Sequence, residues 1–260
     1  MNFKIWLIGG TGDSATIANV LAEANIPLII TVATESAKNL YQSTAVVIAV
    51  RMGLTQMRAF CQQEKISGVI DASHPYAVEV SQQAIAVAEQ IKIPYLRYER
   101  DNYQPEFSSD SSDVVELDSF EHLLEGDYLT EQRVFLTVGC KALPWFKPWH
   151  NRATLFARVL PKIESLETAL AAGFTSDRLV AIRPPISIET EAALWQQWRI
   201  SLVVSKASGE AGGEDIKRRV AADLGIPLII IARPQVAYPR QTSNMAAVLS
   251  FCQRSQNSIF

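Results

Sequence analysis

The sequence predicts an α/β fold built from two Rossmann-like parallel-sheet domains with a cleft between them. The first observation is a glycine-rich turn that joins an apolar strand to a helix near the start of the chain. The second is a junction that occurs three times, at Ile26-Pro27, Ile93-Pro94 and Ile226-Pro227, where a helical segment leads into an apolar run. Proline ends a helix but is tolerated at the first residue of a strand. Repeated β-α-β units of this kind indicate parallel sheets covered by helices.

Hydrophobic periodicity places the elements along the chain. The first strand covers residues 3–8, and Ile17, Val20, Leu21 and Ala24 then fall on one face of a helix. Beyond the strands that begin at the Ile-Pro junctions, we expect strands at residues 45–50, 68–71, 134–137, 153–159, 179–181 and 201–205. We expect further helices at residues 55–64, 77–91, 163–172, 189–198, 213–224 and 243–254.

A polar stretch rich in serine and aspartate runs from residue 101 to residue 113 and predicts a linker. We therefore expect an N-terminal dinucleotide-binding domain over residues 1–100. The C-terminal domain would cover residues 114–260, and its final helix is free to pack on either domain.

Composition limits the classes of function. The chain has 260 residues, of which 48% are hydrophobic and 20% charged, as in an ordinary globular protein. A net charge of −3 gives no overall attraction to nucleic acid or membrane, so we expect neither as a partner. Cys61, Cys140 and Cys252 are odd in number and far apart, which argues against disulfides and favours the cytoplasm. The start of the chain lacks the pattern of a signal peptide.

The glycine-rich turn carries the cofactor prediction. Gly9, Gly10, Thr11, Gly12 and Asp13 join the first strand to its helix, and the stretch from Gly10 fits the GxGxxA form of the dinucleotide fingerprint. Glycine lets the backbone approach a pyrophosphate, and the helix start supplies N–H groups and a positive dipole end. The plain alternative is a turn that only connects a strand to a helix.

Thr34 and Glu35 follow the second strand and complete the predicted dinucleotide site. An acidic side chain at this place can accept a hydrogen bond from a ribose 2′-OH, which favours NADH. Ser36 and Lys38 would instead accept the 2′-phosphate of NADPH, so both cofactors stay open. The plain alternative for Glu35 is a solvated loop residue.

Polar side chains also follow the next two strands. Ser73 and His74 come after residues 68–71, and Arg97 and Arg100 come at the end of the strand that begins near residue 95. Histidine titrates near neutral pH and is a candidate proton donor, while arginine suits carboxylates and phosphates. The alternatives are a histidine that caps the following helix and an arginine cluster that pairs with Glu99.

A second glycine-rich turn contains Lys206, Ser208 and Gly209 and precedes another predicted helix. A cation, hydroxyl groups and backbone N–H groups together indicate an anion site, with a flexible loop as the alternative. Ligands bind outside the carboxyl ends of parallel strands, so we expect this turn to face the first one across the cleft.

Several catalytic motifs are absent from the sequence. There is no GxxxxGK[ST], no Tyr-x-x-x-Lys, no GxSxG and no HExxH. The three histidines show no metal-ligand spacing, so we expect no metal. The missing Tyr-x-x-x-Lys disfavours a nucleotide-sugar epimerase or reductase.

In sequence order these segments resemble the precorrin-6A reductase family of cobalamin biosynthesis, including its cobalt-precorrin-6A branch. The matching stretches are Gly9-Gly-Thr-Gly-Asp13, Val69-Ile-Asp-Ala-Ser-His-Pro-Tyr-Ala77, Ile93-Pro-Tyr-Leu-Arg-Tyr-Glu-Arg100 and Lys206-Ala-Ser-Gly209. Their order and spacing hold over nearly the whole chain. The chain departs from the family in having Asp13 in place of Glu, Ser73 in place of Thr, and only Arg51-Met-Gly53 where many members have a glycine-rich stretch.

The resemblance implies a reductase that moves a hydride from NADPH or NADH, without flavin, to one ring double bond of an anionic tetrapyrrole-derived macrocycle. The product would be the dihydro (6B) macrocycle. The cofactor would lie on Gly9–Asp13 and Thr34–Glu35. Because a carbon next to the one that receives the hydride must gain a proton, our own hypothesis is that His74, or a water that it holds, supplies it. The carboxylates of the macrocycle would meet Ser73, Arg97, Arg100, Lys206, Ser208 and Gly209.

The alternative reading is a non-catalytic NAD(P)-sensing regulatory protein of the GGTG type. Such a protein would not need the second anion-binding turn. The sequence leaves the oligomeric state open, with a monomer as one option.

Overall fold

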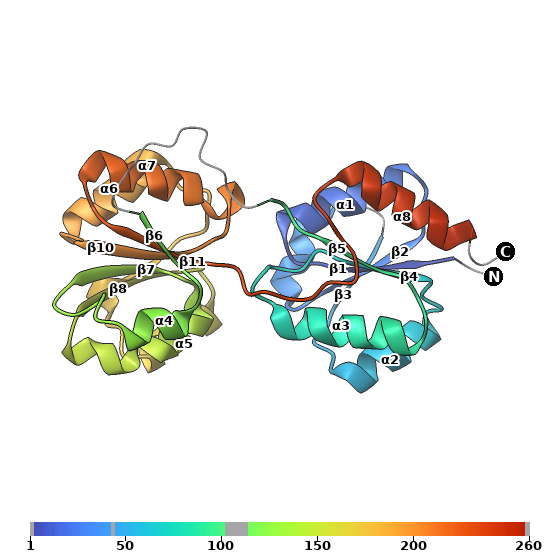
Figure 1. The fold of residues 1–260 in the computed structure, drawn as a ribbon, viewed down its shortest axis with the longest axis horizontal. Helices are drawn as coiled ribbons and strands as arrows, with labels where there is room; N and C mark the ends of the chain where they lie inside the picture. Colours follow the sequence, from blue (N-terminus) through green and yellow to red (C-terminus); the bar gives the residue numbers. More distant parts are fainter. Residues whose placement is uncertain (1–2, 43–44, 102–113, 258–260) are drawn as a thin grey trace. The chain divides into compact units, whose positions relative to one another are not determined.

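The computed structural model describes residues 3–42, 45–101 and 114–257. The chain divides into two compact units, one made of Met1–Asp101 with Gln235–Phe260 and the other of Asn102–Pro234. Each unit contains one six-stranded sheet whose strand pairs are all parallel, and helices cover both faces of each sheet (Figure 1). The predicted α/β class with two parallel sheets is confirmed. The predicted linker falls almost entirely on residues outside the described ones.

The sheet of the first unit has the strand order β12-β5-β4-β1-β2-β3. Its strands are β1 (Ile5–Ile8), β2 (Leu28–Val32), β3 (Val46–Ala49), β4 (Gly68–Asp71), β5 (Tyr95–Tyr98) and β12 (Gln241–Thr242). Its helices are α1 (Gly12–Glu23), the 3₁₀ helix η1 (Glu35–Leu40), α2 (Leu54–Gln63), α3 (Val78–Gln90) and α8 (Met245–Asn257). Every residue of β1 is buried because helices lie on both faces, which explains its uninterrupted apolar sequence.

The order in which the chain adds strands to the sheet reverses beside β1. From β1 the chain moves to β2 and β3 on one side, and it then returns to β4 and β5 on the other side. Such a reversal opens a crevice at the carboxyl ends of the two central strands, where ligands of doubly wound sheets bind. In this unit the reversal of strand order lies between β1 and β4, so the turns after these two strands are the place where a ligand is expected.

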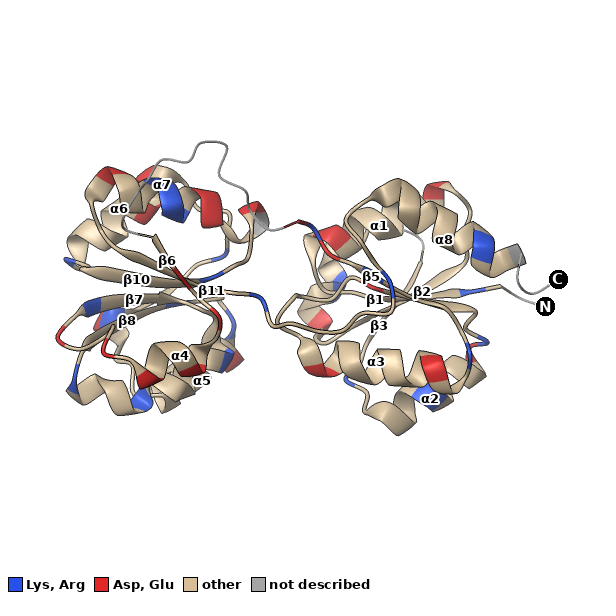
Figure 2. Cartoon of the chain, in the orientation of Figure 1, with Lys and Arg blue, Asp and Glu red and all other residues tan. Residues whose placement is uncertain are grey.

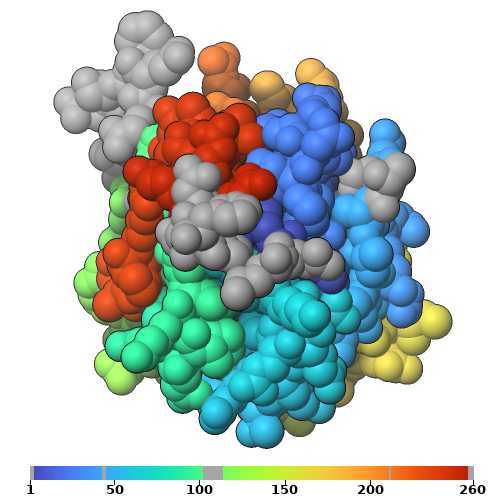
Figure 3. All heavy atoms as spheres, turned by 90° about the vertical axis from the view of Figure 1, so that its right-hand side faces the viewer, coloured from blue at the N-terminus to red at the C-terminus, as the bar shows by residue number. Residues whose placement is uncertain are grey.

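The final segment of the chain returns to the first unit. Strand β12 pairs with β5, with Gln241 opposite Arg97, and Val248, Phe251 and Cys252 of α8 are buried in the same core as β1. Figure 3 shows this segment in red against the blue and green parts of the unit. The sequence left the place of this helix open, because an amphipathic helix fits any apolar face.

The sheet of the second unit has the strand order β6-β11-β10-β7-β8-β9. Its strands are β6 (Val114–Leu117), β7 (Arg133–Thr137), β8 (Thr154–Val159), β9 (Leu179–Ala181), β10 (Leu202–Lys206) and β11 (Leu228–Ile231). Its helices are α4 (Phe120–Glu125), α5 (Ile163–Ala171), α6 (Ile188–Gln197) and α7 (Glu214–Leu224), with 3₁₀ helices η2 (Cys140–Asn151), η3 (Ser176–Arg178) and η4 (Glu210–Gly212).

Five elements of the second unit were not predicted, namely β6, α4, η2 and the short 3₁₀ helices η3 and η4. Strand β6 is a short edge strand with two exposed residues, so it lacks a strong apolar signal. Helix η2 contains Pro144 and Pro148, which conceal a helix from a reading based on α-helical periods. It is held in place by Leu143, Phe146 and Trp149, which are buried in the core of the unit.

Lys, Arg, Asp and Glu occur on most helices of both units, with the two signs intermixed (Figure 2). Within the described residues, no helix is both long enough and apolar enough to span a membrane.

Candidate functional site

The turns after β1 and β4 are joined directly. Thr11 caps α1, since its Oγ1 accepts a hydrogen bond from the Ser14 N–H at 3.1 Å. The same hydroxyl donates to the carbonyl oxygen of Ala72 at 2.8 Å. This bond spans 61 residues of sequence and fixes the glycine turn against the turn that carries Ser73 and His74.

In the glycine turn, some backbone N–H groups are hydrogen-bonded within the protein and others have no acceptor in the described residues. Gly10 N–H donates to Ser14 Oγ at 3.1 Å and to the Tyr41 hydroxyl at 2.7 Å, and Thr11 N–H donates to Ser14 Oγ at 3.0 Å. Within the described residues, the N–H groups of Gly12 and Asp13 have no acceptor. They form the first turn of α1, where orphan donors and the helix dipole favour an anion. Gly10 has a φ of +106°, which side-chain-bearing residues rarely adopt.

Tyr41 is a site residue that the sequence analysis did not identify. It follows η1, and its hydroxyl lies 2.6 Å from Ser14 Oγ as well as against Gly10. A Cβ on Gly9 would collide with this hydroxyl, so the position of Tyr41 is by itself a reason for glycine at residue 9. Burial raises the pKa of Tyr41, which keeps the phenol protonated. The sequence could not indicate this contact, because Tyr41 meets Gly10 and Ser14 only once the sheet places the segment after β2 beside the turn after β1.

Acidic and basic groups both lie after β2. The Glu35 carboxylate pairs with Lys38 Nζ at 2.9 Å and is mostly exposed, while Thr34 Oγ1 lies 3.2 Å from Ser36 Oγ. Arg51, which follows β3, donates from Nε to the carbonyl oxygen of Ala33 at 3.4 Å. The place expected for the adenosine ribose therefore has one carboxylate and two cations beside it.

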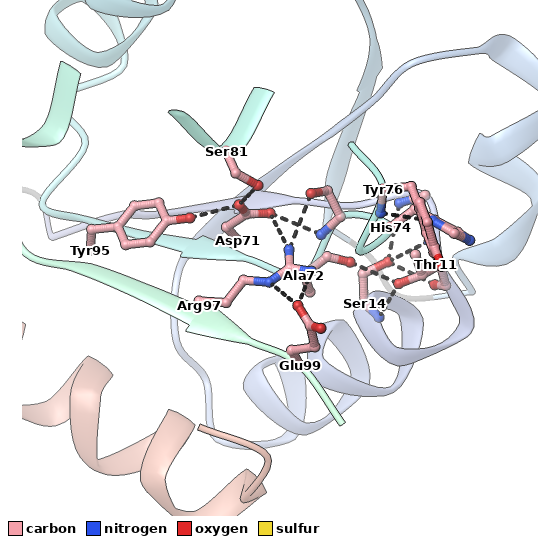
Figure 4. A network of polar contacts seen from close by, with 12 residues as sticks. Thr11, Ser14, Asp71, Ala72, His74, Tyr76, Ser81, Tyr95, Arg97 and Glu99 are labelled. Atoms are coloured by element: carbon pink, nitrogen blue, oxygen red, sulfur yellow. Dashed lines mark hydrogen bonds and ion pairs between the residues drawn. The ribbon is translucent and has the colours of Figure 1, made fainter. Parts of the chain in front are cut away.

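A buried network surrounds Asp71 at the end of β4 (Figure 4). Its Oδ1 accepts from the Ser73 N–H at 2.9 Å and from Arg97 Nη1 at 3.1 Å. Its Oδ2 accepts from Ser81 Oγ at 2.6 Å and from the Tyr95 hydroxyl at 2.7 Å. Burial and the Asp71 carboxylate raise the pKa of Tyr95, so its hydroxyl stays a donor. Four donors on one fully buried carboxylate make the turn after β4 rigid.

Arg97 belongs to this network and has no exposed surface. Its guanidinium contacts Asp71, the Ser73 hydroxyl at 3.2 Å and Glu99 Oε2 at 2.7 Å, and it lies over the Tyr238 ring. Burial alone would lower the pKa of Arg97, but the two carboxylates hold it above its usual value. The structure leaves Arg97 no surface with which to meet a ligand, and it also buries Ser73 almost completely.

His74 is the exposed residue of the same turn. Its Nδ1 accepts a hydrogen bond from the Tyr76 N–H at 3.3 Å, and its carbonyl oxygen accepts from the Ala77 N–H at 2.7 Å. An accepting Nδ1 assigns the proton of the neutral ring to Nε2. Figure 4 shows His74 and Tyr76 at the end of the network where Thr11 and Ser14 also lie.

Asp13 and Arg100, which the sequence assigned to different ligands, pair with each other. Arg100 Nε lies 2.9 Å from Asp13 Oδ2, and both side chains are partly exposed. The arginine offsets a negative charge beside the helix start, where a carboxylate would otherwise repel a phosphate. The pair also ties the end of β5 to the first turn of α1.

Lys206, Ser208 and Gly209 lie in the second unit, whereas the other predicted site residues lie in the first. Gly209 has a φ of +64°, and its N–H donates to Glu214 Oε2 at 2.9 Å. Lys217 Nζ, which is buried, donates to the carbonyl oxygens of Gly212 and Gly213 at 2.7 and 3.0 Å. The turn after β10 is therefore held by α7, and Lys217 is a second residue whose role the sequence analysis did not assign.

Lys206 ends β10, and its Nζ lies 5.5 Å from the centroid of the Phe120 ring. Burial, with repulsion from Lys141 as the second cause, lowers the pKa of Lys206 to about 8. Within the described part of the chain, no group of three or more His, Cys, Asp or Glu side chains is arranged to hold a metal ion.

The first unit thus has a doubly wound parallel sheet, with orphan helix N–H groups and a histidine at the reversal of strand order. A solved structure described as CobK precorrin-6A reductase has the same overall fold, with a TM-score of 0.79, 21% identity, and coverage of 98% of this chain and 97% of that one. The family model described as Precorrin-6x reductase CbiJ/CobK matches residues 4–253. The chain belongs to this family.

Curated relatives agree with that assignment over nearly their whole length. The cobalt-precorrin-6A reductase of Synechocystis sp. is 41% identical over 252 residues, which is 96% of each chain. The cobalt-precorrin-6A reductase of Priestia megaterium is 31% identical and covers 90% of this chain and 92% of its own. The precorrin-6A reductase of Mycobacterium tuberculosis is 28% identical and covers 89% of each chain.

Proposed function

We propose that this protein reduces one ring double bond of precorrin-6A or cobalt-precorrin-6A, with NADPH or NADH as the hydride donor. The observation that carries the proposal is the paired turn after β1 and β4, where orphan N–H groups of a helix start lie beside an exposed histidine. The names of the relatives support the substrate. The free cysteines Cys61, Cys140 and Cys252 support the cytoplasm as the compartment.

The first unit fits a dinucleotide by its unsatisfied donors. Gly12 and Asp13 would hold the pyrophosphate with their N–H groups, while Ser14 and Tyr41 keep the turn in shape. A Cβ built on Gly10 or Gly12 would meet nothing within 4 Å, so the backbone there is open to a ligand. Thr34 and Glu35 would contact the adenosine ribose. When bound, the nicotinamide supplies the hydride.

His74 is our candidate for the proton donor. Hydride transfer to one carbon leaves the adjacent carbon to gain a proton, and a positioned histidine or a water that it holds can supply it. The Asp71 network fixes the backbone of the His74 turn, so we assign Arg97 and Ser73 to positioning this turn. This assignment replaces direct contact of Arg97 with the substrate.

The remaining predicted residues are our candidates for contact with the macrocycle. Arg100, Lys206 and Ser208 have donors suited to carboxylates, through guanidinium, ammonium and hydroxyl groups. Gly209 would instead shape the turn, because its N–H already donates to Glu214. The hydrogen bonds of Gly209 with Glu214 and of Lys217 with Gly212 and Gly213 hold this turn in one shape, which supports it as a pre-organised contact for the macrocycle.

The test is an absorbance assay of the purified protein with precorrin-6A and with cobalt-precorrin-6A, each with NADPH and then NADH. We expect a change in the macrocycle spectrum that depends on a nicotinamide. Tight nicotinamide binding with no spectral change on either macrocycle would favour the regulatory alternative.

His74→Ala is the matched variant for the proton donor. We expect kcat to fall by about 100-fold or more, with nicotinamide affinity within about twofold of the unaltered protein, as for loss of a general acid. An equal loss of turnover and nicotinamide binding would mean that His74 only shapes the turn.

A further inference from the structure

The second sheet has its own reversal of strand order, between β7 and β10. From β7 the chain moves outward to β8 and β9, and from β10 it moves outward to β11 on the other side. The carboxyl ends of β7 and β10 therefore lie at a reversal of strand order, the position at which doubly wound sheets bind ligands. Residues 138–141 follow β7, and residues 207–213 follow β10.

Aromatic and cationic side chains meet at this edge from three elements. Lys206 Nζ lies 5.5 Å from the Phe120 ring centroid, and the Phe120 and Trp145 rings lie 5.1 Å apart in an edge-to-face arrangement. Phe120 begins α4, Trp145 belongs to η2, and Lys206 ends β10. The three residues thus form one continuous contact at the carboxyl ends of β6, β7 and β10.

Trp145 lies on the exposed side of η2, with Pro144, Lys147 and Pro148, although it is a large aromatic residue. Its residue surface is 51% exposed, while Phe146 and Trp149 of the same helix are buried in the core. Exposing a side chain as large as tryptophan to water forgoes the stability that its burial would give. Its flat face is suited to stacking on a conjugated ring. Its exposure next to Phe120 therefore points to a ligand with a flat apolar surface.

The charge at this edge points to an anion. Lys141 is an exposed residue of the first turn of η2, four residues beyond the end of β7. Lys206 ends β10, which pairs with β7 so that Ser205 lies opposite Thr137, and the two neighbouring strands therefore each lead to a lysine at this edge. Two ammonium groups that repel each other are both stabilised when a carboxylate binds beside them. Since Lys206 is also partly buried, a carboxylate there meets a cation in a weakly screened setting.

We propose that Lys141, Lys206 and Trp145 form a subsite for a flat, conjugated ring that carries carboxylates. The ring stacks on Trp145, and a carboxylate at its rim lies between the two lysines. The inference rests on the proposed function, because it assigns the macrocycle of that reaction to these residues. Lys141 and Trp145 are specificity-determining residues in this scheme, and neither takes part in the transfer of hydride.

The experiment uses uroporphyrin, a stable flat porphyrin polycarboxylate, with the full chain and without nicotinamide. Binding is followed by quenching of tryptophan fluorescence and by isothermal calorimetry. We expect Lys141→Ala and Trp145→Ala each to weaken uroporphyrin binding by about 10-fold, the scale of one charge-assisted hydrogen bond or one stacking contact. Citrate, which has carboxylates but no flat ring, should respond to Lys141→Ala and not to Trp145→Ala.

Lys147→Ala is the control, because Lys147 is an exposed lysine of the same helix. We expect this variant to bind uroporphyrin within about twofold of the unaltered protein. Absence of uroporphyrin binding by the unaltered protein, or equal binding by all variants, would overturn the subsite. These outcomes are separate from failure of the reductase assay, since no nicotinamide or turnover is involved.

Discussion

Tyr95→Phe tests whether the Asp71 network stabilises the turn that carries His74. The Tyr95 hydroxyl donates to Asp71 Oδ2 at 2.7 Å, and both side chains are buried. Phenylalanine keeps the ring, so the substitution removes one hydrogen bond to a buried carboxylate and little else. Such a bond to a charged group contributes about 1.5–3 kcal/mol, and we expect a loss of about 2 kcal/mol.

The free energy of unfolding lost in Tyr95→Phe should be smaller than the loss from breaking the Arg97–Asp71 ion pair. Asp71 still accepts from Ser73, Ser81 and Arg97 after the substitution, so its charge stays compensated. Removing the Arg97 partner would leave an unpaired buried charge, at a cost of about 3–5 kcal/mol.

Hydrogen–deuterium exchange with mass spectrometry measures the effect locally. A loss of about 2 kcal/mol corresponds to exchange about 30-fold faster in peptides from β4 and β5, under conditions where exchange reports the opening equilibrium. Peptides of the second unit should not change. Tyr98→Phe on the same strand is the control, because in the described part of the chain its hydroxyl makes no hydrogen bond. Equal exchange in the two variants would refute the role given to the Tyr95 hydroxyl.

Three further predictions concern ligands. The KM for the macrocycle should rise as pH increases through about 8, since Lys206 is a cation below its pKa of about 8 and neutral above it. In Lys206→Arg the KM should no longer rise over this pH range, because arginine stays charged. The same rise of KM in this variant would contradict the role given to Lys206. Gly9→Ala should weaken nicotinamide binding by about 10-fold, because its Cβ displaces Tyr41 from the turn, and adding Tyr41→Phe should restore part of the affinity. Arg51→Ala should raise the KM for NADPH by about 10-fold and leave that for NADH within about twofold, since only NADPH has a 2′-phosphate; equal effects would place this phosphate elsewhere.

The alternation of helices and strands could be predicted because it depends on local signals. The Ile-Pro junctions and the apolar run before Gly9 identify buried parallel strands without any knowledge of their neighbours. The return of α8 to the first unit could not be predicted, since its apolar face has no local mark for the sheet that it covers. Helix η2 was missed because Pro144 and Pro148 obscure its period.

The candidate site was predicted best where function depends on backbone. The glycine turn and the His74 turn follow their strands as expected, and strand order then brings them together. Side chains were harder to assign, because the sequence does not show burial. Arg97 is a residue type that commonly binds carboxylates, but here it is buried inside the Asp71 network. Tyr41 contacts the glycine turn only because the folded chain brings the end of η1 beside it.

The most direct test of the reductase proposal is the transfer of deuterium from a nicotinamide labelled at the carbon that gives up its hydride. The protein is incubated with precorrin-6A or cobalt-precorrin-6A and the labelled NADPH or NADH, and the macrocycle product is analysed by mass spectrometry. We predict that the label appears in the reduced macrocycle. A reduced macrocycle without label, or no reduced macrocycle with either substrate, would contradict the proposal.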